Sequence, residues 1–142
     1  MRRLLLFLGV SIALFTIHSC TKKIEVTEQK YKDGSPKLVV TYEVNGDTKT
    51  KLSAIQYYQN GQIEYQGSNN KDGRRIGHWV YYYEDGILWS EAEYLNGERH
   101  GKSAVYYENG KVRYTGNYKD GKTVGKWLFY DEKGNIVKEL NY

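Results

Sequence analysis

The sequence predicts an all-β protein after residue 20: an elongated antiparallel β-meander in a single sheet, built from hairpin repeats of about 24 residues. The chain of 142 residues contains 15 Tyr and 15 Gly but only one Pro, a composition that suits strands joined by tight turns. Asn-Gly and Asp-Gly pairs, the strongest short signal of a hairpin, recur along it. The stretches KDGRRIGHW (71–79) and KDGKTVGKW (119–127) repeat one pattern.

The first residues differ from the rest and predict an N-terminal signal helix. Residues 1–3 read MRR, and residues 4–17 are apolar, which is shorter than the ~20 residues that span a bilayer. A basic start, a short apolar run and then small residues are typical of a secretory signal peptide. We therefore expect a signal peptide over 1–19; a membrane anchor or a core helix is the alternative.

The apolar run ends in IHSC, which resembles the lipobox of bacterial lipoproteins. Ile17, Ser19 and Cys20 match that pattern, whereas His18 stands where a small residue is usual. Cys20 is the only cysteine, so it cannot form an internal disulfide. The resemblance implies cleavage before Cys20, lipidation of that residue and attachment to the cell envelope, at the outer membrane or the periplasmic face.

Cleavage would lower the net charge of the chain. The signal segment carries Arg2 and Arg3 and no acid, which leaves 21 − 2 = 19 basic and 17 acidic residues, a formal charge of +2. That excess is too small for a surface that neutralises phosphates, so we expect no nucleic acid partner.

Three series of glycines recur every 24 or 25 residues and mark the turns of the repeat. Two of the series follow Asn, Asp or Lys in turn sequences, and the third follows the second by four residues. Glycine accepts the positive φ that such turns need. The series are Gly61, Gly86, Gly110 and Gly134; Gly73, Gly97 and Gly121; and Gly77, Gly101 and Gly125.

Folding each hairpin about its turn places the repeated tryptophans opposite glycines. An indole can cover a strand residue that has no side chain, which explains why the two residue types recur together. In the middle hairpin both partners are small. The facing pairs are Gly67 with Trp79, Ala92 with Ser103, and Gly116 with Trp127.

Alternation along the strands predicts one aromatic and one charged face. We assign to the aromatic face Ile63, Tyr65, Trp79, Tyr81, Tyr83, Leu88, Tyr94, Val105, Tyr107, Val112, Tyr114, Trp127, Phe129 and Ile136. We assign to the charged face Gln62, Glu64, Gln66, His78, Glu93, Lys102, Lys111, Arg113 and Lys126.

Trp89 is an exception on the predicted charged face. The aligned positions of the other repeats hold Glu64 and Arg113, and its neighbour across the hairpin is Tyr106. A lone Trp–Tyr pair among charged residues is a candidate contact with a partner.

The repeat resembles MORN-type repeats, in particular the bacterial variant found in proteins labelled as antitoxin components. The stretches YYQNGQIEYQG and YYENGKVRYTG carry this resemblance, which covers 57–142 well and 30–56 weakly. It implies an elongated β-meander used for binding and scaffolding. The expected divisions are the signal peptide 1–19, a lipidated N-terminus and spacer or first edge strand 20–30, and a repeat domain 31–142 with units 30–56 (degenerate), 57–81, 82–105, 106–129 and 130–142 (partial).

No catalytic motif is present in the sequence, so we expect no enzyme. His78 and His100 each flank a turn glycine. A metal site needs three or four convergent ligands, so we interpret both as solvated side chains. We expect neither a metal nor a cofactor.

The expected function is non-enzymatic binding of a protein partner, or scaffolding, by a repeat lipoprotein held to the membrane through its N-terminal lipid. The alternative is an antitoxin or immunity component, against which an export signal counts because it removes the protein from the cytosol. A second alternative is a glycan- or choline-binding surface module, since Gly, Trp and paired Tyr also recur in choline-binding repeats, whose aromatic cages hold a quaternary ammonium.

Overall fold

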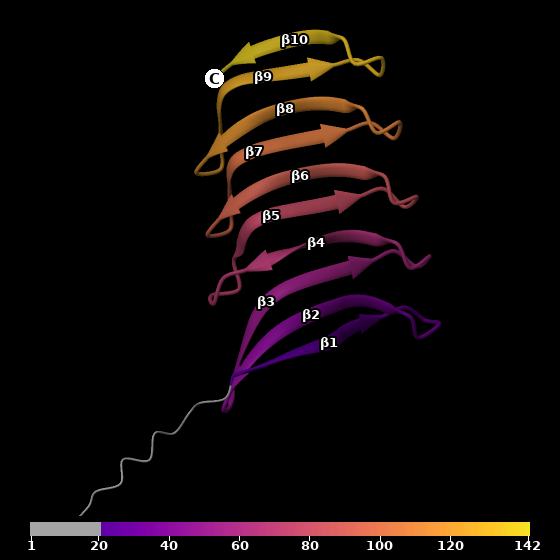
Figure 1. Ribbon diagram of the computed structural model, residues 1–142, viewed down its shortest axis with the longest axis vertical. Helices are drawn as coiled ribbons and strands as arrows, with labels where there is room; N and C mark the ends of the chain where they lie inside the picture. The colour runs from indigo at the N-terminus through magenta and orange to yellow at the C-terminus, as the bar shows by residue number, and fades with distance from the viewer. Residues whose placement is uncertain (1–20) are drawn as a thin grey trace, which may run out of the picture.

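The computed structural model describes residues 21–142, which form ten β-strands in one antiparallel sheet. Each strand pairs with the next in sequence order, so the predicted single-sheet meander is confirmed (Figure 1). The signal helix expected over 1–19 and the lipidation expected at Cys20 lie outside the described residues. Within 21–142, no helix is both long enough and apolar enough to cross a membrane.

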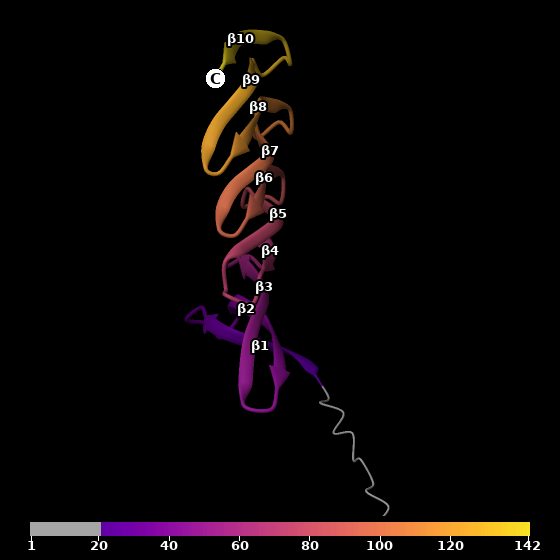
Figure 2. The same ribbon diagram turned by 90° about the vertical axis from the view of Figure 1, so that its left-hand side faces the viewer.

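The strands follow one another along the long axis of the molecule (Figure 1). Figure 2 shows that β1 and β2 are turned relative to the strands that follow. The segment expected to be a spacer or an edge strand is an edge strand, β1. The strands are β1 (Lys22–Lys30), β2 (Pro36–Asn45), β3 (Thr48–Tyr57), β4 (Ile63–Asn69), β5 (Arg75–Tyr82), β6 (Leu88–Leu95), β7 (Glu98–Tyr106), β8 (Val112–Lys119), β9 (Lys122–Tyr130) and β10 (Ile136–Asn141).

Five-residue loops join each odd-numbered strand to the next even one, and an Asx side chain helps to close each of them. In the loop 83–87, Tyr83 accepts a hydrogen bond from the N–H of Gly86 (2.9 Å) and donates its own N–H to Ile87 (2.8 Å). The Asp85 carboxylate accepts the N–H of Ile87 at 3.0 Å, as Asx residues do in turns. The backbone pattern recurs at 31–35, 58–62, 107–111 and 131–135.

The tyrosines that begin these loops connect each repeat to the next. Their hydroxyls donate to backbone carbonyls 23 to 26 residues further along the chain. We call these four residues the tyrosine ladder: Tyr31 donates to Tyr57 (2.7 Å), Tyr58 to Tyr82 (2.8 Å), Tyr83 to Tyr106 (2.9 Å) and Tyr107 to Tyr130 (2.8 Å). The fifth loop begins with Asp131, so the ladder ends there.

At the other ends of the strands, two hairpin turns are of type I′, which Asn-Gly and Asp-Gly predict. Asn96 and Gly97 both have positive φ, at 51° and 95°, and so do Asp120 and Gly121, at 50° and 76°. The corresponding turn between β4 and β5 is a five-residue loop, 70–74, instead. The extra residue in the 25-residue spacing from Gly61 to Gly86 therefore lies in this turn.

The third glycine series marks places where the pairing register shifts. Gly77, Gly101 and Gly125 have φ of 63°, 105° and 65°. In the β8–β9 hairpin, Thr115 pairs with Leu128 but Asn117 pairs with Val124, so β9 contributes extra residues around Gly125. The glycines allow the local backbone conformation that this shift requires.

The buried centre of the sheet follows the predicted Trp–Gly pairing. Trp79 and Trp127 are 3% and 4% exposed, although the described residues form a single layer. A Cβ added to Gly67 or to Gly116 would lie 2.1 Å from the Cδ2 atom of the facing indole. Each indole therefore occupies the space that a side chain on the glycine would need. In the middle hairpin Ala92 pairs with Ser103, as predicted.

Candidate functional site

Each even-numbered strand contains a β-bulge at its second residue. In the β5–β6 pair, Tyr82 pairs with Leu88 and Tyr81 with Ser90, which leaves Trp89 as the extra residue. The pairings of β2, β4, β8 and β10 skip one residue at the equivalent place. We call the five extra residues the bulge row: Lys37, Glu64, Trp89, Arg113 and Val137.

The bulge corrects the predicted placement of Trp89. Simple alternation put it on the charged face beside Tyr106, but the Trp89 ring lies 6.1 Å from the ring of Tyr81 and 6.2 Å from that of Tyr83, on the aromatic face. The Tyr106 hydroxyl donates instead to Glu91 at 2.6 Å. An extra residue in one strand shifts the in–out alternation by one, which a count along the chain cannot show.

The same correction applies to Glu64 and Arg113, which were assigned to the charged face. The Glu64 carboxylate accepts a hydrogen bond from the Gln56 amide at 2.7 Å, and Gln56 pairs with Tyr65 of the aromatic face. The Arg113 guanidinium lies 5.7 Å from the ring centroid of Tyr107. Both side chains therefore lie on the aromatic side of the sheet.

The bulge row lies along the tyrosine ladder. The Lys37 ammonium is 5.6 Å from the centroid of the Tyr31 ring, and Trp89 contacts Tyr83. Burial raises the pKa of Tyr58, and the negative charges of Glu64 and Glu84 raise it further. Tyrosine rings that recur in four of the five loops thus support side chains that differ between repeats.

The bulge row is accessible to solvent. Trp89 is 44% exposed and Val137 is 63% exposed, and both are large apolar side chains. Arg113 is exposed, whereas Lys37 and Glu64 are half-buried. Exposed apolar side chains rimmed by charges are typical of contact surfaces.

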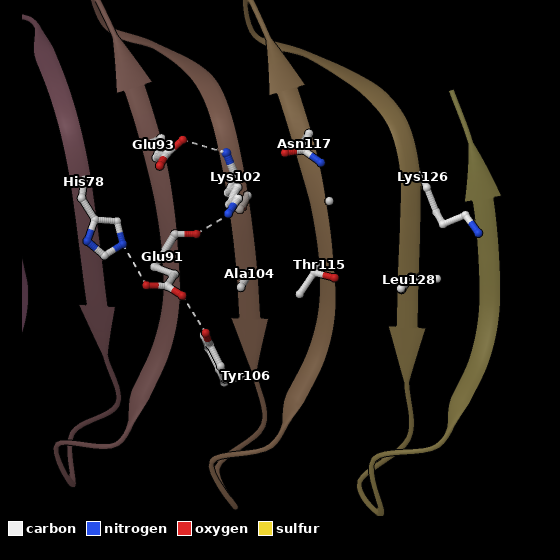
Figure 3. A pocket seen from close by; sticks show the side chains of 12 residues that line it. His78, Glu91, Glu93, Lys102, Ala104, Tyr106, Thr115, Asn117, Lys126 and Leu128 are labelled. Atoms are coloured by element: carbon white, nitrogen blue, oxygen red, sulfur yellow. Dashed lines mark hydrogen bonds and ion pairs between the residues drawn. The ribbon is translucent and has the colours of Figure 1, made fainter.

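The opposite face carries a hollow of about 490 Å³ across β5 to β9, which we call the polar groove (Figure 3). Carboxylates, amines and hydroxyls surround a floor of small and aliphatic residues. The groove is lined by His78, Glu91, Glu93, Lys102, Ser103, Ala104, Tyr106, Thr115, Gly116, Asn117, Lys126 and Leu128.

Glu91 is the centre of a hydrogen-bond network in the polar groove (Figure 3). One of its carboxylate oxygens lies 2.8 Å from Nε2 of His78, and the other accepts the Tyr106 hydroxyl. Burial raises the pKa of Tyr106 to about 12, and the hydrogen bond to the Glu91 carboxylate adds to this shift. The network fixes the orientation of three side chains from three strands.

Glu93 and Lys102, both assigned to the charged face, meet through the backbone of Lys102. The Glu93 carboxylate accepts a hydrogen bond from the backbone N–H of Lys102 at 3.0 Å. Further along the groove, Lys126 forms an ion pair with Glu139 of β10 at 2.6 Å. Acidic groups thus lie on β6 and β10 and amines on β7 and β9, so the charges along the groove alternate in sign.

The aromatic face contains a cation site filled by the chain itself. The Arg75 guanidinium lies 4.3 Å from the ring centroid of Trp79, 5.5 Å from that of Tyr94 and 5.9 Å from that of Tyr81. Its Nη1 atom also donates to the Tyr81 hydroxyl at 2.7 Å. A cation between aromatic rings is favourable, and here it also covers Trp79.

The two described histidines are side-chain partners of acids. His78 contacts Glu91, and Nδ1 of His100 lies 3.2 Å from Asp120. In the part of the chain that the structure describes, no group of three or more His, Cys, Asp or Glu is placed to hold a metal ion.

Sequence reasoning missed the bulge row and the tyrosine ladder. The ladder had a visible signal, because a pair of tyrosines precedes the turn glycine at 57–58, 82–83 and 106–107. The bulges had a weaker signal: the second residue of the even-numbered strand differs in every unit.

No curated protein is significantly similar to the chain. One solved structure, described as the crystal structure of TarM, resembles it with a TM-score of 0.32 at 12% sequence identity, over 84% of this chain and 21% of that one. The chain thus spans about a fifth of the length of that protein. The pattern of the MORN repeat variant matches residues 53–68, 75–96, 99–120 and 123–142, more than half of the sequence. With its ten-stranded meander of hairpin repeats, the chain belongs to the MORN repeat variant family.

Proposed function

We propose that this protein is a non-enzymatic protein-binding module of the bacterial cell envelope, tethered by a lipid on Cys20. One observation carries the proposal: the scaffold repeats, but the bulge row does not. Tyrosines join the repeats in the same way at four of the five loops, whereas the bulge positions carry Lys, Glu, Trp, Arg and Val in turn. Repeat proteins recognise partners in this way, with an extended surface of variable residues on a constant frame.

The exposed apolar side chains support a macromolecular partner. Trp89 and Val137 of the bulge row are 44% and 63% exposed. Apolar groups arranged along an elongated sheet suit a partner that contacts several repeats at once. A contact of this kind places a large aromatic residue near its centre, which is the position of Trp89 in the row.

The lipid tether would determine how the sheet is presented. Cys20 precedes β1 by two residues, so a lipid there holds the β1 edge near the membrane. Nine steps of ~4.8 Å place β10 about 43 Å from that edge. Stable anchoring needs more than one acyl chain, and the lipoprotein pattern at Cys20 implies several.

Arg75 argues against the choline-binding alternative. The aromatic cluster of Trp79, Tyr81 and Tyr94 has the composition of a cation cage, but it already holds the Arg75 guanidinium. A quaternary ammonium would have to displace an internal cation that also donates a hydrogen bond. No feature of the described residues favours the antitoxin alternative over binding in the envelope.

Site-specific photocrosslinking in the native cell tests the proposal. A photoreactive amino acid replaces Trp89 in the full-length protein, and a matched variant carries it at Lys119, which is exposed beside a turn. We expect a discrete protein adduct from position 89 that mass spectrometry identifies, and none from position 119. A lipid or glycan adduct at position 89, or no adduct from a folded and exported protein, would contradict the proposal.

A further inference from the structure

The bulge residues from β4 to β10 form a regularly spaced row. They lie on every second strand, and neighbouring strands of a sheet are ~4.8 Å apart, so the step between them is ~9.6 Å. Figure 1 shows the loops that precede these strands one above another along one side of the sheet. Lys37 belongs to the β1–β2 hairpin, which is turned away from this alignment in Figure 2.

A partner segment that uses this row needs a residue facing the sheet every ~9.6 Å. A polyproline II helix has three residues per turn and a rise of 3.1 Å, so it repeats every ~9.3 Å. An extended strand presents the same face every ~6.7 Å, and an α-helix does so every ~10.5 Å over two turns. Over the three steps from Glu64 to Val137 the mismatch is ~1 Å for polyproline II and ~3 Å for the α-helix.

The surface around the row suits the same conformation. Aromatic rings line it, because Trp89 lies against Tyr81 and Tyr83, and the ring of Tyr107 lies under Arg113. Grooves lined by aromatic residues bind polyproline II segments, whose preformed shape loses little conformational entropy. The hydroxyls of Tyr83 and Tyr107 are engaged with backbone carbonyls, so their rings are fixed in place.

The charges along the row specify the order of side chains in the partner. Glu64 is acidic, Trp89 is aromatic, Arg113 is basic and Val137 is apolar. We propose that the bulge row binds a polyproline II segment that carries a basic residue, a proline, an acidic residue and an apolar residue at every third position, facing these four residues in that order. The inference rests on the proposed protein-binding function and adds the chemistry of the partner.

A set of labelled peptides tests the inference with purified full-length protein. The matched probe is a fluorescein-labelled polyproline peptide with Arg, Glu and Val at its third, ninth and twelfth positions. A swapped probe exchanges Arg and Glu, and a shifted probe moves Glu by one residue, which turns it away from the sheet. The shifted probe fits the row in neither chain direction. The swapped probe restores both charge pairs only in the reverse direction, where its Val no longer faces Val137. Fluorescence anisotropy at low ionic strength measures the dissociation constants.

We expect the matched probe to bind more tightly than either control, by about threefold or more, since the shifted probe loses one charge pair and the swapped probe loses its contact with Val137 when it reverses. Trp89→Ala should weaken the matched probe about tenfold or more, and Trp89→Tyr should weaken it less. The double variant Glu64→Arg, Arg113→Glu should prefer the swapped probe. Circular dichroism verifies that each variant is folded.

Three results would overturn the inference: no binding of the matched probe at millimolar concentration, affinities for the three probes within about twofold, or an unchanged preference in the double variant. Each of them leaves the proposed function standing if Trp89 still crosslinks to a protein in cells. Loss of the crosslink together with loss of probe binding removes both proposals.

Discussion

The indole of Trp79 lies directly over Gly67. A Cβ on the glycine would lie 2.1 Å from Cδ2 of the indole, and the ring nitrogen of Trp79 donates to the carbonyl of Ser68 at 3.0 Å. Arg75 covers the other side of the ring. Trp79 thus becomes almost fully buried in a single-layer sheet, because Gly67 of the neighbouring strand β4 lies on one side of the indole and the Arg75 guanidinium of β5 lies on the other.

Gly67→Ala should therefore destabilise the protein. The added methyl group overlaps the indole, and overpacking of this kind costs about 1–3 kcal/mol in the free energy of unfolding. Urea denaturation followed by circular dichroism measures the effect.

The middle hairpin supplies the control for this substitution, because Ala92 there pairs with Ser103. Combining Gly67→Ala with Trp79→Ser reproduces that natural pair. Gly67→Ala should therefore lower the free energy of unfolding much less in the Trp79→Ser variant than in the native protein. An equal cost in both backgrounds would show that the contact between indole and glycine is not responsible.

Tyr83→Phe should weaken the connection between repeats. The substitution removes the hydroxyl that donates to the carbonyl of Tyr106 at 2.9 Å and leaves the ring in place. A hydrogen bond of this kind contributes about 0.5–1.5 kcal/mol to stability, and the urea midpoint should fall accordingly. Tyr82→Phe is the control, because Tyr82 takes part in the ladder through its backbone carbonyl. A similar loss from both substitutions would contradict the ladder.

Tyr106 makes stability depend on pH in the alkaline range. Its pKa is raised to about 12 in the folded protein, above the ordinary value near 10, so folding favours the protonated phenol. This contribution is fully present below about pH 10 and is lost as pH rises toward 12. Urea midpoints measured from pH 9 to pH 11 should fall more steeply for the native protein than for Tyr106→Phe. An identical fall of the urea midpoint with pH in the two proteins would show that the Tyr106 phenol has the same pKa in the folded and unfolded states.

Cys20→Ala should block export processing. If Cys20 is the lipidated residue, the native protein carries acyl chains on a new N-terminus at this position and fractionates with membranes. The variant should keep its N-terminal segment and its original start. Mass spectrometry of the purified protein distinguishes the two forms, and an unmodified Met1 on the native protein would contradict the lipoprotein proposal.

The sequence was sufficient for the repeat and insufficient for the contact surface. The positions of the turns, the Trp–Gly pairs and the middle Ala92–Ser103 pair followed from local signals, because each hairpin forms within one stretch of chain. The placement of Trp89 failed because the bulge depends on how β6 pairs with β5. One unpaired residue in a strand moves the side chains on one side of it to the opposite face of the sheet. Counting along the sequence assumes that no residue is left unpaired.

The Tyr-Tyr pairs illustrate the same division. The second tyrosine of each pair begins a loop, and the hydroxyl of Tyr58 reaches the backbone of the next repeat, 24 residues away. A bond of that kind exists only once neighbouring hairpins are stacked in register. The sequence alone determined the 24-residue period, the turn chemistry and the indole–glycine pairs, since all of these are satisfied within a hairpin. Only the tertiary structure decided which side chains the sheet displays together, because pairing between strands sets the bulges and the bulges set the faces.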